Sequence, residues 1–237
     1  MKNQVLMRTK PVDRRRSRQR GFTLVEIAIV LVIIGLLLGG ILKGQEMITQ
    51  AKIKNVVNDF NGITAAMNSY QDRYRALPGD DLNAATRWAT ASPGVVSGDG
   101  NGQFTGTYNN VLAATPTAAQ ETNLFWWHLR LAGFVAGPTI AGAAAGQQPN
   151  NAVNGIMGVA TGAGAATLGF TSNIVCTTNL PDKIAISIDT QMDDGTYNSG
   201  QVRGILQAGP NPALRAQVAG DAYQETGTNQ YTLCMNL

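Results

Sequence analysis

A long apolar segment near the N-terminus constrains this chain more than any other feature. Residues 22–42 carry a single charged side chain, Glu26, and the run from Ile27 to Leu42 is apolar without interruption. As an α-helix, these residues would extend roughly 31 Å, which matches a bilayer core of about 30 Å. We therefore predict that residues 22–42 form a membrane-spanning helix.

The charge distribution predicts which side of the membrane each part of the chain occupies. The first twenty residues carry eight lysine and arginine side chains against one aspartate, whereas the whole chain has a formal net charge of only +3. Basic residues that flank a membrane segment stay in the cytoplasm, so the rest of the chain is expected on the opposite side. That remainder is net negative, and we predict no nucleic acid contact for it, because such contact needs clustered basic side chains.

Two other kinds of protein begin with a basic segment followed by an apolar one. A secretory signal is cut after its apolar part at a site of small residues, whereas this chain continues as Lys43-Gly-Gln-Glu46. A plain membrane anchor needs no cleavage site and remains an alternative. The residues at the start of the apolar segment favour a third kind.

The junction between the basic and apolar segments carries a short motif, Arg20-Gly-Phe-Thr-Leu-Val-Glu26. In this context it resembles the processing site of type IV prepilins and type II secretion pseudopilins. The resemblance implies that residues 1–21 are a leader peptide, which prepilin peptidase removes by cutting after Gly21. It also implies N-methylation of Phe22. The resemblance covers the N-terminal third of the chain well and the remainder only loosely.

Glu26 is the residue in the apolar segment that most needs a partner. An ionisable group at the centre of a bilayer costs on the order of 2.5–3.5 kcal/mol, so such residues are usually functional. Cleavage after Gly21 would create an ammonium group on Phe22, and Glu26 of one subunit could pair with Phe22 of its neighbour in a filament. The alternative is that Glu26 reaches the headgroups, since it lies one turn from the membrane surface.

The resemblance also implies the partners and the location of the protein. Beside prepilin peptidase, these partners are identical or related pilin subunits, an inner-membrane platform protein and a cytoplasmic assembly ATPase. The precursor is expected in the bacterial inner membrane with a cytoplasmic N-terminus and a periplasmic head. After assembly it would belong to a periplasmic or extracellular filament.

The helix is predicted to continue beyond the membrane as an amphipathic segment, residues 43–76. No proline interrupts this segment, and apolar side chains recur every three or four positions. They are Ile53, Val56, Phe60, Ile63, Met67, Tyr70 and Tyr74. Pro78 and Gly79 then end the helix. We expect the apolar stripe to be buried against a globular head formed by residues 77–237.

Within the head, the sequence predicts an α+β fold. Residues 124–131 should form a helix that packs Leu124, Trp127 and Leu131 inward, although Phe125-Trp126-Trp127 could instead form a sugar-stacking platform. His128, the single histidine, is expected to be structural. Alternating apolar residues predict strands over 183–189, 201–207 and 231–237, with the first two paired. The expected architecture is an antiparallel sheet laid against the long helix, which is also the pilin-like layout that the resemblance implies.

Cys176 and Cys234 are the only cysteines in the chain. Because the head is expected in an oxidising compartment, we predict a disulfide that ties the last strand to the sheet. Many pilins carry a C-terminal disulfide loop of this kind. Two buried free thiols are the alternative.

The segment from Ser97 to Gln103 places oxygen-bearing side chains at alternate positions among glycines. Asp99, Asn101 and Gln103 are therefore candidate calcium ligands, although ordinary turn chemistry explains the same residues. No other cofactor is expected.

Three classes of function agree with these features. The first, which we favour, is a structural subunit of a type IV pilus or of a type II secretion-type pseudopilus. The second is a minor tip subunit whose head binds a surface or a substrate. The third is a membrane-anchored exported enzyme, which we do not expect because no acid pair, nucleophile motif or metal cluster stands out.

Overall fold

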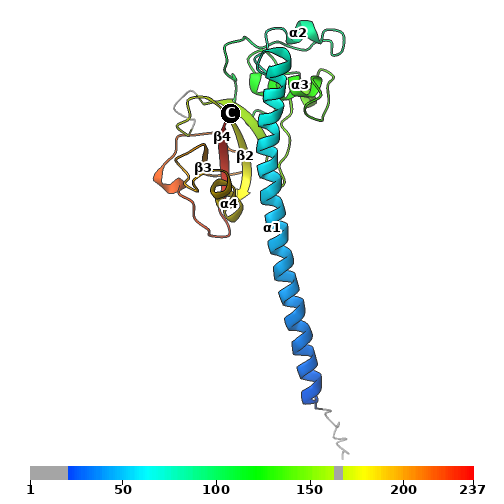
Figure 1. Cartoon of the computed structure of the whole chain (residues 1–237), viewed down its shortest axis with the longest axis vertical. Helices are drawn as coiled ribbons and strands as arrows, with labels where there is room; N and C mark the ends of the chain where they lie inside the picture. Colours follow the sequence, from blue (N-terminus) through cyan, green and yellow to red (C-terminus); the bar gives the residue numbers. More distant parts are fainter. Residues whose placement is uncertain (1–20, 163–167) are drawn as a thin grey trace, which may run out of the picture. The chain divides into compact units, whose positions relative to one another are not determined.

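The computed structural model describes residues 21–162 and 168–237, so the predicted leader, apart from Gly21, lies outside the described residues. The chain divides into two compact units, one ending at Glu46 and a head unit of Met47–Leu237. In chain order, the elements are α1 (Leu24–Tyr74), α2 (Ala84–Arg87), α3 (Glu121–Leu131), η1 (Ala143–Gly146), β1 (Met157–Thr161), β2 (Asn173–Pro181), α4 (Asp182–Met192), β3 (Val202–Leu206), η2 (Ala219–Asp221) and β4 (Gln230–Asn236) (Figure 1). The chain thus has a long N-terminal helix and a C-terminal antiparallel sheet, as predicted.

α1 is a single helix of 51 residues. It ends where the sequence predicts, because Arg75 adopts a positive φ of 54° and Pro78 follows shortly after. Its buried side chains all lie in the head unit and form one stripe, which consists of Ile53, Val56, Phe60, Ile63, Ala66, Met67 and Tyr70. The predicted amphipathic stripe is therefore confirmed, with Tyr74 half-buried at its end.

The sheet has four antiparallel strands in the order β1-β2-β4-β3. The C-terminal strand β4 is therefore an interior strand, and it pairs with β2 on one side and β3 on the other. Val159, Val175 and Leu233 of the sheet belong to the same core as the α1 stripe. One face of the sheet thus packs with α1.

α3 contributes the largest side chains of this core. Leu124, Phe125, Trp126 and Trp127 are all fully buried. The prediction that Leu124 and Trp127 pack inward is confirmed, whereas Leu131 is only half-buried. The alternative of a sugar-stacking platform is wrong, because none of the three aromatic rings is exposed.

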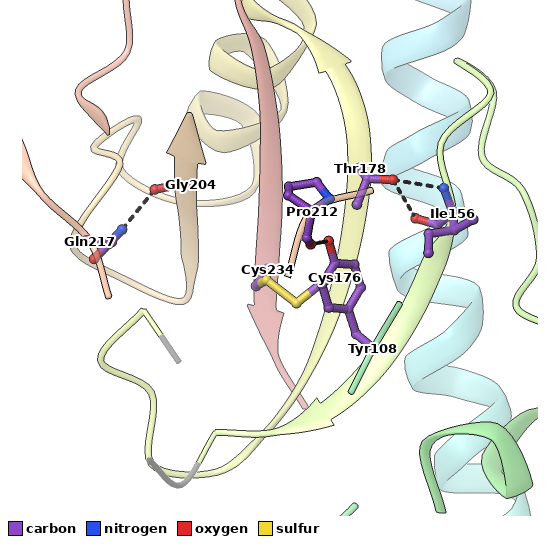
Figure 2. Close-up of a disulfide and its surroundings, with 8 residues drawn as sticks. All are labelled: Tyr108, Ile156, Cys176, Thr178, Gly204, Pro212, Gln217 and Cys234. Carbon is purple, nitrogen blue, oxygen red and sulfur yellow. Dashed lines mark hydrogen bonds between the residues drawn. A yellow bond between two sulfur atoms is a disulfide. The ribbon is translucent and has the colours of Figure 1, made fainter. Parts of the chain in front are cut away.

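The second face of the sheet is covered by connecting segments. Cys176 and Cys234 are directly paired across β2 and β4, and a disulfide of 2.06 Å joins their sulfur atoms. Figure 2 shows the Tyr108 ring beside this disulfide, with its hydroxyl group directed to the carbonyl oxygen of Pro212, to which it donates a hydrogen bond. A Cβ atom on Gly158 would lie 2.0 Å from the Tyr108 carbonyl oxygen, so glycine is needed for this segment to cross β1.

The structure corrects one predicted strand and one predicted pairing. Residues 183–189 do not form a strand but lie in helix α4, and β3 pairs with β4 instead. The apolar residues Ile184 and Ile188 are four positions apart, so they satisfy the helical period as well as the strand period. In the folded chain these two side chains and Ala185 are buried in the core that contains Leu233 of the sheet.

Asp189, near the end of α4, is a fully buried carboxylic acid. It accepts hydrogen bonds from the Tyr223 hydroxyl and from the Gly195 N–H, the latter at 3.0 Å. Burial raises the pKa of Asp189 to about 6, and the neighbouring Asp194 and Asp193 add to the rise, whereas the two hydrogen bonds oppose it. The pKa of Asp182, at the start of the same helix, is lowered instead of raised. Although burial opposes it, N–H donors from Lys183, Gly227 and Thr226 hold the pKa of Asp182 below its usual range.

We expect removal of the disulfide to destabilise the protein substantially. The bond closes a loop with a sequence separation of 58 residues. The double substitution of Cys176→Ala and Cys234→Ala should therefore lower the free energy of unfolding by about 2–4 kcal/mol. Denaturant unfolding of the full chain measures this loss, and the reduced wild-type protein should match the double variant. An unchanged unfolding free energy would contradict a structural role for the bond.

We expect Asp189 to make the protein less stable as the pH rises through the range between its unfolded and folded pKa values. The folded state keeps this proton to about pH 6, whereas the unfolded state releases it near pH 4. The unfolding free energy of Asp189→Asn relative to wild type should thus increase by about 2 kcal/mol from acidic to neutral pH. Asp182→Asn should show the opposite slope. A pH-independent difference for Asp189→Asn would contradict the assignment.

Candidate functional site

The candidate processing and assembly site lies at the start of α1. Gly21 and Phe22 precede the helix, which begins at Leu24. Phe22 is 83% exposed, and the large apolar side chains of the segment up to Leu42 are exposed as well. A new N-terminus at Phe22 would therefore lie one helical turn from Glu26.

Thr23 and Glu26 form a reciprocal cap at this end of the helix. The Glu26 N–H donates to Thr23 Oγ1 at 3.2 Å, and both the N–H and the hydroxyl of Thr23 donate to Glu26 Oε2 at 2.8 Å. This is a capping box, in which two residues three positions apart satisfy free donors of the first helical turn. The spacing Thr23-x-x-Glu26 is the local sequence signal for this cap.

The capping box gives the Glu26 carboxylate hydrogen-bond donors within its own chain. A carboxylate that accepts hydrogen bonds at the N-terminus of a helix is stabilised by those bonds and by the helix dipole. Within a single chain, Glu26 therefore already has polar partners. Both Thr23 groups donate to Oε2, and a carboxylate accepts at both of its oxygens, so a partner from another subunit can bind without displacing Thr23.

α1 also meets the requirements for crossing a membrane. It contains an 18-residue window with a mean hydropathy of 2.8, none of which is buried within the protein. A soluble core helix would have most of such a window buried, whereas here the apolar side chains point outward on every side. These observations are consistent with membrane anchoring.

A comparison with protein families shows what the start of the chain is similar to. The family described as the prokaryotic N-terminal methylation motif matches residues 16–42. The chain carries the type IV pilin and pseudopilin signature. The matched range includes the end of the basic segment, the predicted cleavage junction and the apolar part of α1. No curated protein and no solved structure matches the chain. The predicted resemblance of the N-terminal segment to pilins is therefore confirmed. The match supports the interpretation that the chain is a pilin or pseudopilin precursor.

The predicted calcium ligands lie in a loop that two further carboxylates organise. Carboxylate oxygens of Asp80, Asp99 and Glu121 lie within 4.8 Å of one another. Asn101 lies beside Asp99, to which its side-chain amide donates at 2.8 Å, whereas Gln103 accepts from the Thr161 hydroxyl at 3.4 Å. The structure thus brings Asp99 together with two acids that no local sequence motif indicates, because they lie 19 and 22 positions away.

Asp80 and Glu121 already bind the backbone of this loop. Asp80 accepts from the N–H groups of Asn101 at 3.0 Å and Gly102 at 2.7 Å. Glu121 accepts from the N–H groups of Asp99 and Thr105, both at 2.9 Å. Burial raises the pKa of both carboxyl groups, although these hydrogen bonds oppose the rise. Calcium binding by Asp99, Asn101 and Gln103 stays a prediction, and Asp80 and Glu121 lie close enough to Asp99 to join these ligands.

The calcium prediction can be tested on thermal stability. Binding to the folded state alone would raise the midpoint of thermal unfolding in Ca²⁺ relative to a chelator. Asp99→Asn should remove this difference, whereas Glu225→Gln, an exposed acid elsewhere, should keep it. Equal midpoints for the wild-type protein with Ca²⁺ and with chelator would contradict calcium binding.

Proposed function

We propose that the chain is the precursor of a structural filament subunit of a type IV pilus or a type II secretion-type pseudopilus. Prepilin peptidase cuts it after Gly21 and methylates the new N-terminus at Phe22. The observation that supports this proposal most directly is the methylation motif at residues 16–42. The motif runs into the apolar part of α1, and the same helix supplies the core of the head unit.

Assembly would add a charged partner to the hydrogen-bond donors that Glu26 has within its own chain. In the single chain the Glu26 carboxylate accepts from the N–H and hydroxyl of Thr23. After cleavage, the ammonium of Phe22 on a neighbouring subunit offers a full positive charge in a water-free environment, where opposite charges attract strongly. The apolar surface of α1 would leave lipid for an equally apolar bundle of helices, so the ion pair would set the axial register rather than drive extraction from the membrane.

The location and partners follow from this role. The precursor would span the inner membrane once, with its N-terminus in the cytoplasm and its head in the periplasm, and would join a periplasmic or extracellular filament. Its partners would be related or identical subunits, an inner-membrane platform protein and a cytoplasmic assembly ATPase. We propose no contact between the head and nucleic acid.

A structural role is favoured over the two other classes. The methylation-motif family is structural and not enzymatic, and we extend this to the present chain. A sugar-binding tip subunit would need an exposed platform, whereas Phe125, Trp126 and Trp127 are fully buried. No observation on the described residues favours a binding head over a structural one.

The first test of the proposal is the intact mass of the protein purified from membranes of its own host. We expect loss of residues 1–21, one added methyl group on Phe22 and two hydrogens fewer for the disulfide. Tandem fragmentation should place the methyl group on Phe22. A full-length mass, or cleavage beyond Leu42, would contradict processing as a pilin.

The second test concerns Glu26. Glu26→Val should leave cleavage largely intact but strongly reduce assembly with native subunits, because it removes the carboxylate that pairs with Phe22. Cleavage is measured by the size shift in membranes, and assembly by the sheared filament fraction. Glu46→Gln is the matched control, since it removes a carboxylate from the same helix outside the predicted membrane segment. Normal incorporation of Glu26→Val into filaments would exclude the pairing.

A further inference from the structure

An open cavity of about 270 Å³ lies between α1, α3 and the start of β1. Its wall is mainly apolar and includes Ile63, Trp126, Phe134 and Met157. Asp59 of α1 lines it as well, and it is the one charged residue among the described residues that do so. All of these residues belong to the head unit. The cavity therefore combines an apolar wall with a single negative charge.

The Asp59 carboxylate has no partner within its own chain. The side chain is half-buried, and burial alone raises the pKa of the carboxyl group, with no hydrogen bond or charge of the described residues acting on it. Other carboxylates of the head are paired, since Arg87 binds Asp81 and Arg215 binds Asp221. A carboxylate that loses part of its hydration without gaining a partner is unfavourable. The partner of Asp59 is therefore expected to come from outside the chain.

The cavity has the chemistry to receive a lysine side chain. Its apolar wall would contact the methylene groups of such a side chain, while the ammonium group reaches the carboxylate of Asp59. Trp126 and Phe134 add aromatic rings, with which an ammonium group interacts favourably. An anion would be repelled by Asp59, and a wholly apolar group would leave the carboxylate unpaired.

The proposed filament contact at Glu26 indicates which lysine comes to the level of this cavity. Glu26 pairs with Phe22 of the neighbouring subunit, four positions earlier, so the neighbour is displaced by about 6 Å along α1. Neighbours in a filament are related by one repeated displacement, so the same shift applies at Asp59. Four positions before Asp59 the chain has Asn55, and Lys54 is adjacent to it.

Lys54 is available for such a contact. Its side chain is exposed, and it takes part in none of the ion pairs of the described residues, whereas Lys43 is held by Glu46 at 3.0 Å. Five positions along a helix correspond to about 140° of rotation, so Lys54 and Asp59 point to different sides of α1 and do not meet within one chain. A pair between them therefore needs two subunits.

We propose that Lys54 of one subunit enters this cavity of its neighbour and pairs with Asp59. The inference rests on the proposed function, because it uses the register that the contact between Glu26 and Phe22 defines. The contact is heterologous, since the lysine and the cavity lie on different sides of one helix. Such contacts repeat along a filament instead of closing a dimer. Each subunit would give its lysine to one neighbour and receive a lysine from another.

Charge exchange tests this contact in filaments that the full-length chain forms in its own host. Asp59→Lys and Lys54→Asp should each reduce the sheared filament fraction at least several-fold, because like charges then meet at every contact. A chain that carries both substitutions should assemble as the wild type does. The two single variants expressed together should also assemble, because the two kinds of subunit can alternate. Asp72→Lys, which changes an exposed acid of the same helix, is the matched control and should assemble normally.

Two results would overturn the proposed contact while the wild-type chain still forms filaments. One is normal assembly of either single variant. The other is failure of both single variants without recovery in the exchanged chain or in the mixture, which would give the two side chains separate roles. Failure of the proposed function is distinguishable, because the wild-type chain would then be neither cleaved after Gly21 nor found in filaments. That result would overturn both proposals.

Neutral substitutions keep the test decisive if a charge reversal impairs folding, which loss of the cleaved protein from membranes would reveal. Asp59→Asn and Lys54→Gln each remove one charge without adding repulsion. Each should lower the filament fraction, and the double variant should lower it no further than either single variant, because one pair is lost in all three cases. Losses that add in the double variant would exclude a pair between the two side chains.

Discussion

The burial of one apolar stripe on α1 is the interaction on which the head unit depends. Phe60 and Tyr70 of this stripe are fully buried in a core that also holds Trp127 of α3 and Leu233 of the interior strand. Burying side chains of this size contributes about 1.5–3 kcal/mol each. Nearer its N-terminus the same helix has exposed apolar side chains on every side. Along one continuous helix, α1 is thus apolar on all sides near its N-terminus and apolar on a single buried stripe within the head unit.

The order of the strands makes the end of the chain indispensable to this core. β4 lies between β2 and β3, so until the last residues are in place β3 has no partner strand and β2 is paired with β1 alone. The disulfide from Cys176 to Cys234 holds this interior pair, and Tyr108 covers it on the face away from the α1 core. Contacts so distant in sequence are costly to form in loop entropy, and a covalent link reduces that cost.

Polar side chains fix the segments that leave α1. The single histidine, His128, accepts from the Gly79 N–H at its Nδ1 atom, and its Nε2 atom lies 2.9 Å from the Val96 carbonyl oxygen. Burial lowers the pKa of His128 to about 4, so the ring is neutral and serves a structural role. Asp80 and Glu121 hold the next loop by accepting its N–H groups.

The sequence by itself determined the features that depend on neighbours along the chain. The apolar run, the junction at Gly21 and Phe22, and the stripe from Ile53 to Tyr70 are periodic or contiguous, and the lone pair of cysteines left one possible disulfide. Only the tertiary structure decided between helix and strand for α4, because Ile184 and Ile188 fit both periods and the core that receives them is distant in sequence. It alone brought Asp80 and Glu121 to Asp99, since contacts between remote residues leave no local pattern.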